Sequence, residues 1–372
     1  MSPRVVVAPD KFKGSLSATE VAARVAAGLR GERPAVDVDE VPVADGGEGT
    51  VEAALAAGFR PVRVTATGPL GEPVETRYAV GGEVAVVEMA AVTGLQMITP
   101  DGGTARRASS RGLGEVIAHA LDHGAKTVVV GIGGSASTDG GAGMLAALGA
   151  RLSGPDGDVP NGGEALRTLT RVDLGGLHPR LADAHLVLAS DVDNPLLGPA
   201  GAAAVYGPQK GADPTTVDDL DAALATWVAA LEPVRPEARR LAEEPGAGAA
   251  GGVGYGCLLL GAEFRPGVEV VLDLAGFDRR LEGADLVVTG EGSLDEQSLH
   301  GKTPVGVARA AAAHGIPVVA VCGRSTLDAR RARDAGLQSV HALTDIEPDV
   351  ARCVADAGNL LERLAARIAA SL

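Results

Sequence analysis

Five short loops in the sequence carry carboxylates, hydroxyls, lysines and glycines in combinations that can bind an anion. They are DKFKGS at 10–15, ADGGEGT at 44–50, GGSASTDGGAG at 133–143, SDVDNP at 190–195 and GEGSLDEQ at 290–297. Each loop follows a short apolar run of the kind that forms a buried strand. Ligands of parallel α/β sheets bind beyond the carboxyl ends of the strands, so the five loops predict one polar site.

The chemistry that fits these residue types is phosphoryl transfer. It needs backbone amides and lysines to neutralise phosphate charge, carboxylates to hold Mg²⁺, and one carboxylate to accept a hydroxyl proton. Only five of the 33 basic residues are Lys, and four of these five lie in or beside Gly-rich or Asp-containing loops. A compact ammonium on a flexible stem suits phosphate as a point charge.

Two common nucleotide motifs do not match. A Walker A loop ending at Gly301 and Lys302 would need Gly at position 296, where the chain has Glu296. The letters GAGAAG at 246–251 match the dinucleotide fingerprint but follow a charged stretch instead of a strand. GIGGSA at 131–136 does follow a strand, but an Asp-Gly-Gly soon interrupts any helix. A nicotinamide-dependent oxidoreductase is therefore a weaker alternative.

Each loop taken singly also has a purely structural interpretation. Asp10 and Asp45 could cap helices, and GGSASTDGGAG could be only a tight strand-to-helix turn. Asp191 and Asp193 could belong to a turn before Pro195. Taken together, the five loops contain more carboxylates, hydroxyls and glycines than turn formation requires.

Composition excludes several classes of protein. The net charge of −15 disfavours nucleic acid and anionic membranes as partners. One Trp, three Tyr and four Phe are too few for base-stacking platforms. The three cysteines are scattered, no signal peptide is recognisable, and no apolar run is long enough to span a membrane. We expect a cytoplasmic protein with a small-molecule substrate, and a homo-oligomer is left open.

The order of apolar runs predicts two α/β domains. Strand and helix patterns alternate at both ends of the chain, which favours a doubly wound parallel sheet of the Rossmann or flavodoxin-like kind. Between them, from about residue 62, strands separated by Gly/Pro turns predict a mixed α/β domain. We therefore expect a discontinuous domain at 1–61 and 286–372, a mixed domain inserted at 62–285, and an active site in the cleft between them. Single helices are expected near 216–243 and over 350–371.

Six motifs in the same order resemble the bacterial glycerate kinase family of the type-1 class. They are APDKFKGSLSATEVA, PVADGGEGT, GIGGSASTDGGAGML, SDVDNPLLGPAGAAAVYGPQKGA, GAGAAGGVGYG and VVTGEGSLDEQSLHGKTPVGVA. The resemblance covers residues 8 to about 308, and it implies two α/β domains, one inserted in the other. It also implies ATP-dependent phosphorylation of D-glycerate with Mg²⁺, at the 2-hydroxyl to give 2-phosphoglycerate. A glycerate 3-kinase giving 3-phosphoglycerate is the alternative.

The site residues follow from these motifs. Asp191 is the first choice for the general base, and Asp45 is an alternative base or metal ligand. Asp295 and Asp193 are expected to bind metal, and Lys11 and Lys13 to neutralise phosphate or the glycerate carboxylate. Further residues expected to bind substrate or phosphate are Asp10, Ser15, Gly46, Gly47, Glu48, Gly133, Gly134, Ser135, Ser137, Thr138, Asp139, Asn194, Glu291, Ser293, Gln297 and Lys302. A non-catalytic protein that binds a small hydroxy acid is a third functional class that stays open.

Overall fold

The chain folds into two compact units, here called unit 1 and unit 2. The computed structural model describes residues 2–372, except for the side chain of His300. Unit 1 consists of the chain up to Asp45, Glu52–Gly58 and Pro266–Leu372, and unit 2 consists of Gly46–Val51 and Phe59–Arg265. Within residues 2–372, no helix combines the length and the apolar character needed to cross a bilayer.

Unit 1 is built on a five-stranded sheet in which all strand pairs are parallel. The strand order is β14-β13-β12-β1-β2. The strands are β1 (Arg4–Pro9), β2 (Asp37–Glu40), β12 (Leu286–Leu294), β13 (Val318–Ser325) and β14 (Ser339–Ala342). The carboxyl ends of all five strands therefore lie at one edge of the sheet.

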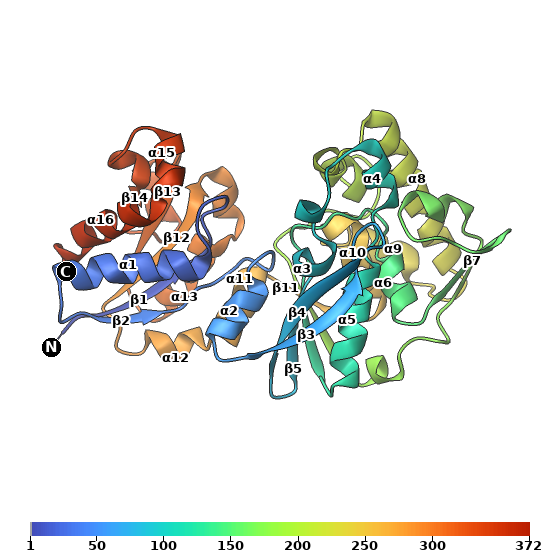
Figure 1. The fold of residues 1–372 in the computed structure, drawn as a ribbon, viewed down its shortest axis with the longest axis horizontal. Helices are drawn as coiled ribbons and strands as arrows, with labels where there is room; N and C mark the ends of the chain where they lie inside the picture. Colours follow the sequence, from blue (N-terminus) through green and yellow to red (C-terminus); the bar gives the residue numbers. More distant parts are fainter. Residues whose placement is uncertain (1) are drawn as a thin grey trace. The chain divides into compact units, whose positions relative to one another are not determined.

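Helices cover both faces of this sheet, because consecutive residues of its central strands are apolar and point to opposite faces. Val5 and Val7 of β1 belong to one core with α1 (Ala18–Glu32) and α16 (Ala357–Ala369), which lie side by side (Figure 1). Val6 belongs to the opposite core, to which residues of five other helices contribute. The remaining helices of unit 1 are α11 (Gly267–Leu274), α12 (Phe277–Leu281), α13 (Thr303–Ala313), α14 (Ala329–Asp334), α15 (Val350–Ala355), η5 (Glu296–His300) and η6 (Leu343–Asp345). The chain passes from unit 2 to unit 1 within α2 (Thr50–Ala56).

Unit 2 contains a mixed six-stranded sheet in the order β11-β10-β6-β5-β4-β3. The strands are β3 (Arg60–Thr67), β4 (Pro73–Gly81), β5 (Val84–Glu88), β6 (Thr127–Gly131), β10 (His185–Ala189) and β11 (Glu263–Arg265). The four strands from β5 to β11 are parallel, whereas β3, β4 and β5 pair antiparallel. The strand ends Glu88, Gly131, Ala189 and Arg265 lie in one row.

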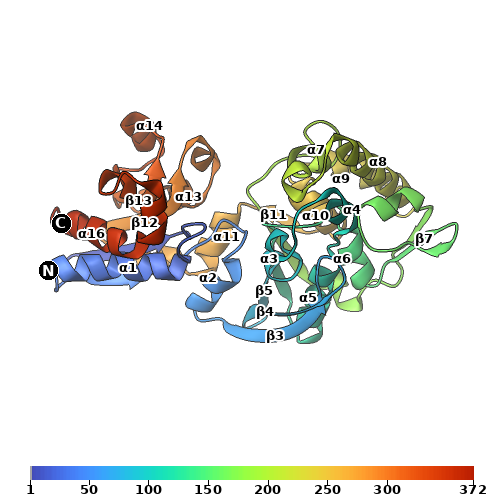
Figure 2. The ribbon, with the colours of Figure 1, turned by 45° about the horizontal axis from the view of Figure 1, so that its top comes forward.

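A three-stranded sheet and a set of helices complete unit 2 (Figure 2). The small sheet has the order β8-β7-β9, with β7 (Arg151–Gly154), β8 (Gly157–Asp158) and β9 (Arg171–Asp173). The α-helices are α3 (Ala90–Thr93), α4 (Gly102–Arg107), α5 (Arg111–Asp122), α6 (Ala142–Ala147), α7 (Ala202–Tyr206), α8 (Pro214–Leu231), α9 (Ala238–Glu243) and α10 (Ala249–Leu259). The 3₁₀ helices are η1 (Leu95–Met97), η2 (Glu164–Thr168), η3 (Pro179–Ala182) and η4 (Pro208–Lys210).

The predicted fold class is confirmed, with two corrections to individual helices. The single helix expected near 216–243 is wrong, because α8 ends at Leu231 and α9 begins at Ala238. Pro233 and Pro236 lie between them, and proline cannot donate the backbone hydrogen bond that would continue the helix. The single helix expected over 350–371 is wrong too, since Asp356 leaves helical geometry between α15 and α16.

Candidate functional site

Three acidic residues meet at the carboxyl edge of the unit 1 sheet. Pro9 pairs with Gly290 across β1 and β12, and the Asp10 amide donates to the Gly290 carbonyl at 2.8 Å. Asp10 and Glu291 are therefore the next residues of two neighbouring strands. The Val43 amide donates to the Pro9 carbonyl at 3.0 Å, which brings the following Asp45 to the same edge.

Asp10 is a buried carboxylate with three donors around it. Its Oδ1 accepts from the Lys11 amide at 2.6 Å and lies 3.8 Å from the Lys11 ammonium. Its Oδ2 accepts from the Thr303 hydroxyl at 3.0 Å. Burial raises the pKa of Asp10 to about 6, with the charge of Asp45 adding to the rise and Lys11 opposing it. Asp10 is therefore poised to change protonation state close to neutral pH.

Glu291 is a second carboxylate with a raised pKa at this edge. Burial raises the pKa of Glu291 to about 7, against the opposing effects of the Ser298 hydrogen bond and the Lys302 charge. The charges of Asp10 and Asp295 add to the rise. Its Oε1 is buried and has no hydrogen-bond partner within the described part of the chain. An acceptor oxygen left without a donor is suited to a cation or to a substrate hydroxyl.

The predicted lysines of unit 1 lie around this pair of carboxylates. Lys11 is half-buried beside Asp10, while Lys13 is exposed in the turn that follows. The Ser15 hydroxyl closes that turn by donating to the Phe12 carbonyl at 3.1 Å. Lys302 is the N-cap residue of α13, and its positive charge lowers the pKa of Glu291. The structure thus places Lys11 beside the buried Asp10 and Lys302 near the half-buried Glu291.

The segment from 293 to 297 has mostly local roles. Asp295 accepts from the Gln297 amide at 2.9 Å and caps η5, and the Gln297 side chain is exposed. The Ser293 hydroxyl accepts from the Arg324 guanidinium at 3.2 Å. Ser293 pairs with Arg324 across β12 and β13, so Arg324 also lies at this edge. The Asp295 carboxylate acts on the pKa of Glu291, and Arg324 contacts Ser293 at the same edge.

In unit 2, three predicted loops meet at the carboxyl edge of the mixed sheet. The loop from Gly133 follows β6, and Asp191 follows β10 by two residues. Because Gly131 and Ala189 are register partners, these two loops begin side by side. Asp191 is half-buried, and Asp193 is exposed. Both aspartates therefore emerge at the edge where the glycine-rich loop begins.

The loop 46–50 packs against the loop 133–139 backbone to backbone. The Gly133 amide donates to the Gly46 carbonyl at 3.4 Å, and a Cβ at Gly133 would lie 2.6 Å from the Gly47 Cα. Only glycine fits this approach. Glu88, at the end of β5, accepts from the amides of Gly49 and Val51 at 3.1 Å each. The Glu88 carboxylate thus fixes the loop 46–50, in which Glu48 is exposed.

Asp139 holds the loop 133–139 from inside. It is fully buried, and its Oδ2 accepts from the amide and hydroxyl of Ser110 at 2.8 and 2.9 Å and from the Gly143 amide at 3.2 Å. Burial raises the pKa of Asp139, and these hydrogen bonds oppose the rise. Asp139 therefore anchors the turn, while the buried hydroxyls of Ser137 and Thr138 find no hydrogen-bond partner within residues 2–372.

Hydrogen bonds define the roles of Asn194 and of three residues that the sequence analysis did not assign to the site. Asn194 donates to the Ala200 carbonyl at 2.9 Å and accepts from the Tyr206 hydroxyl at 2.6 Å, which orders the segment between them. The residues that the sequence reasoning missed are Thr303, Glu88 and Lys210, which contact Asp10, the loop 46–50 and the loop 133–139. The scarcity of lysine pointed to Lys210, whereas no local pattern marked Glu88.

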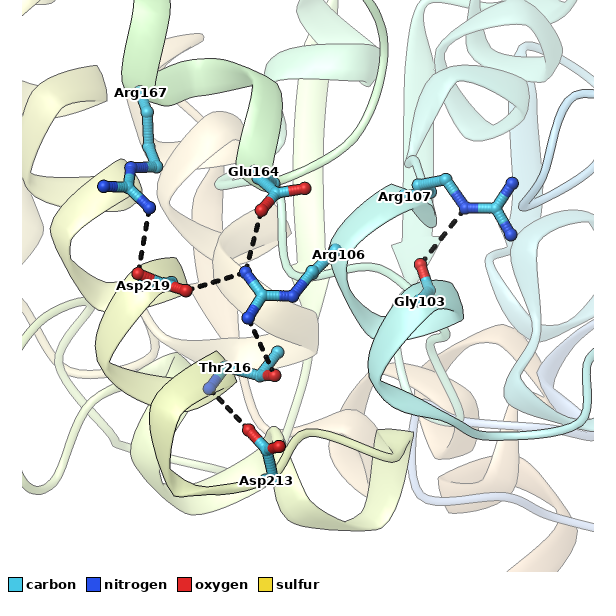
Figure 3. A network of polar contacts seen from close by, with 8 residues as sticks. All are labelled: Gly103, Arg106, Arg107, Glu164, Arg167, Asp213, Thr216 and Asp219. Carbon is cyan, nitrogen blue, oxygen red and sulfur yellow. Dashed lines mark hydrogen bonds and ion pairs between the residues drawn. The ribbon is translucent and has the colours of Figure 1, made fainter.

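A polar network fixes the start of α8 (Figure 3). Arg106 of α4 contacts Asp219 and Glu164 at 2.8 Å each, and also the Thr216 hydroxyl at 3.1 Å. Asp213 caps α8 by accepting from the Thr216 amide at 2.7 Å. Three separate chain segments are thereby tied together around the N-terminus of α8, three residues after Lys210.

The chain matches one protein family in sequence and in structure. Residues 5–372 match the model of the Glycerate kinase family. The chain is 42% identical to Glycerate kinase of Bacillus subtilis (strain 168), over 99% of this chain and 97% of that protein. It is 42% identical to Glycerate 2-kinase of Escherichia coli (strain K12), over 91% of this chain and 90% of that protein. A crystal structure described as glycerate kinase 2 of Salmonella typhimurium LT2 superposes with a TM-score of 0.83 at 41% identity, covering 100% of this chain and 98% of that one.

Proposed function

The chain belongs to the glycerate kinase family, and we propose that it transfers the γ-phosphoryl group of ATP to the 2-hydroxyl of D-glycerate. The products are 2-phosphoglycerate and ADP. The similarity to the Escherichia coli relative described as Glycerate 2-kinase supports the 2-position. The observation that carries the proposal is the pair formed by the buried Asp10 and the half-buried Glu291, which lie next to Lys11 and Lys302. The lysines can neutralise the charge of a phosphate chain, and the carboxylates can bind the cation that accompanies it.

In the proposed reaction the hydroxyl oxygen of glycerate forms a bond to the γ-phosphorus, and the bond from that phosphorus to the bridging β–γ oxygen breaks. ADP leaves with the electron pair of that bond. The hydroxyl proton passes to a carboxylate, for which Asp191 is the first candidate. Asp45 is the alternative within unit 1. The lysines Lys11, Lys13 and Lys302 neutralise phosphate or carboxylate charge without taking part in bond formation.

The residues of unit 1 also fit a Mg²⁺ ion. Mg²⁺ binds through one or two carboxylates together with substrate phosphates and water. Among the side chains that the structure describes, no group of three His, Cys, Asp or Glu gathers around one point, but such a group is not required. The partnerless Oε1 of Glu291 and the neighbouring Asp295 supply oxygen ligands of the right type. We propose that these two residues hold Mg²⁺, which would neutralise phosphate charge when bound.

An assay of ADP release tests the proposal. We expect release to require both ATP with Mg²⁺ and D-glycerate. Phosphorus NMR without proton decoupling then distinguishes the products, because phosphate on C2 couples to one proton and gives a doublet, whereas phosphate on C3 couples to two protons and gives a triplet. Absence of glycerate-dependent ADP release would reject the kinase activity, and a triplet would reject the 2-position.

Replacing Lys302 by Ala is expected to raise the KM for one substrate roughly 10- to 100-fold, the range for loss of a charge-assisted hydrogen bond. Lys302 begins α13 beside Glu291, where an ammonium can reach a phosphate oxygen. Steady-state kinetics measures the change. Arg309→Ala on the same helix is the matched control, since Arg309 is exposed and only 3.8 Å from Glu269. Equal kinetics for both variants would remove Lys302 from the site.

A further inference from the structure

Lys210 is a buried cation directly beneath the loop 133–139. Its side chain is 1% exposed, and its ammonium donates to the Ser135 hydroxyl at 2.9 Å and to the Ser137 carbonyl at 2.5 Å. Lysine is rarely buried to this extent, because removing an ammonium from water is costly unless it gains strong partners. Its burial at this place therefore requires an explanation.

The Lys210 side chain donates two hydrogen bonds to the glycine-rich loop. Burial lowers the pKa of Lys210 to about 7, and the nearby charge of Asp139 opposes that fall. Asp139 holds the far end of the loop through Ser110 and Gly143. The loop is thus fixed at one end by a buried carboxylate and in its middle by a buried ammonium.

The chain around Lys210 is closely packed against neighbouring segments of unit 2. Lys210 ends the short helix η4, and Gly211 follows with φ +94°. A Cβ at Gly211 would lie 2.3 Å from the Asp101 amide nitrogen, so the backbone fits only with glycine there. The Arg106 network in Figure 3 then fixes the start of α8. The ammonium is thereby presented to the loop from a fixed scaffold.

We propose that Lys210 is a positioning residue of the reaction: its ammonium holds Ser135–Ser137 in the conformation in which the loop receives an anionic oxygen group of a substrate. This inference rests on the proposed function. The anionic group belongs either to the phosphates of the nucleotide or to the carboxylate of D-glycerate. A purely structural lysine would stabilise unit 2 without affecting the Kd or KM of the folded protein for its substrates. Measuring Kd and KM therefore distinguishes the two roles.

The test compares Lys210→Met and Lys210→Arg with the wild-type chain. Met keeps the length of the side chain but removes the charge and the donors, whereas Arg keeps both. Lys126→Met is the matched control, because Lys126 precedes β6 at the opposite end from the loop and is an exposed partner of Glu83. Calorimetric titrations with ADP–Mg²⁺ and with D-glycerate separate the two sources of the anion. Hydrogen exchange reports on residues 133–139.

For Lys210→Met, assayed well below its melting temperature, we expect a rise in Kd and KM for one of the two ligands of roughly 10- to 100-fold, as for a lost buried charged hydrogen bond. Exchange should accelerate in residues 133–139, and Lys210→Arg should recover part of the affinity. Kinetic constants within twofold of the wild type, or a lowered melting temperature with unchanged Kd and KM, would overturn the proposal.

A second variant covers the case in which Lys210→Met does not fold. Ser135→Ala removes one acceptor of the ammonium and leaves only a small cavity. It should weaken binding of one of the two ligands several-fold, and unaltered binding of both would overturn the proposal. If the wild-type chain bound neither ADP nor D-glycerate, the proposed function would fall as well. Wild-type binding with an unaffected Lys210→Met variant rejects the role of Lys210 alone.

Discussion

Replacing Asp191 by Asn is expected to lower kcat by roughly two to four orders of magnitude, the range for loss of a general base. Asp191 follows β10 at the carboxyl edge of the unit 2 sheet, beside the start of the loop 133–139. Asn has nearly the same shape but cannot accept the hydroxyl proton. ATP binding should therefore stay within a few-fold of the wild type. Turnover and nucleotide titration measured on the same preparation separate the two effects.

The control for this prediction lies at the other end of the same strand. Asp183 is exposed and precedes β10, so Asp183→Asn should leave kcat unchanged. Asp45→Asn tests the alternative base in unit 1. If Asp45→Asn abolished turnover while Asp191→Asn retained it, the proton acceptor would belong to unit 1. If either variant needed a different Mg²⁺ concentration for half-maximal turnover, the replaced aspartate would instead be a metal ligand.

Replacing Glu291 by Gln is expected to stabilise the protein at pH 7 while lowering its activity. A carboxyl group whose pKa rises from 4.5 to about 7 on folding destabilises the ionised folded state. Each pKa unit corresponds to about 1.4 kcal/mol, so the upper bound is about 3 kcal/mol. Because the Gln side chain would leave one of its own polar atoms without a hydrogen bond, we expect the free energy of unfolding to rise by only about 1–2 kcal/mol. Denaturant unfolding at pH 7 measures it.

The pH dependence of stability gives this prediction a definite sign. Between the unfolded and folded pKa values the folded state of Glu291 binds more protons than the unfolded state, so stability falls as the pH rises from about 4.5 to about 7. Asp10 contributes in the same direction between its ordinary value of 3.8 and about 6. The slope should be smaller in Glu291→Gln than in the wild type.

A carboxylate on the surface provides the comparison for Glu291. Glu296 of η5 is exposed and pairs with Arg331, so Glu296→Gln should change neither the slope nor the stability by more than a few tenths of a kcal/mol. An identical pH slope in wild type and Glu291→Gln would show that the pKa of Glu291 is the same in the folded and the unfolded protein. The raised pKa would then have no part in the site.

Much of the site could be predicted from the sequence because strand ends are local features. Apolar runs followed by Gly, Asp and Lys marked Asp10, Asp45, Asp191 and Glu291, and each of them lies at the carboxyl edge of its sheet. The alternation of strand and helix at the chain ends predicted the parallel sheet in the same way. The order of the motifs identified the family, which the comparisons confirm.

Tertiary structure decided what each of these polar residues does. Asp10 and Thr303 are 293 positions apart in the sequence, yet they share a hydrogen bond. Asp139 and Asp10 look alike in the sequence, but Asp139 is enclosed by donors that anchor a turn, whereas Asp10 faces Lys11 and a second acidic residue. The placement of Lys210 under a loop 75 residues earlier has no local sequence signal. Protonation and hydrogen bonding depend on burial and on charges within a few ångströms, and only the folded chain brings those neighbours together.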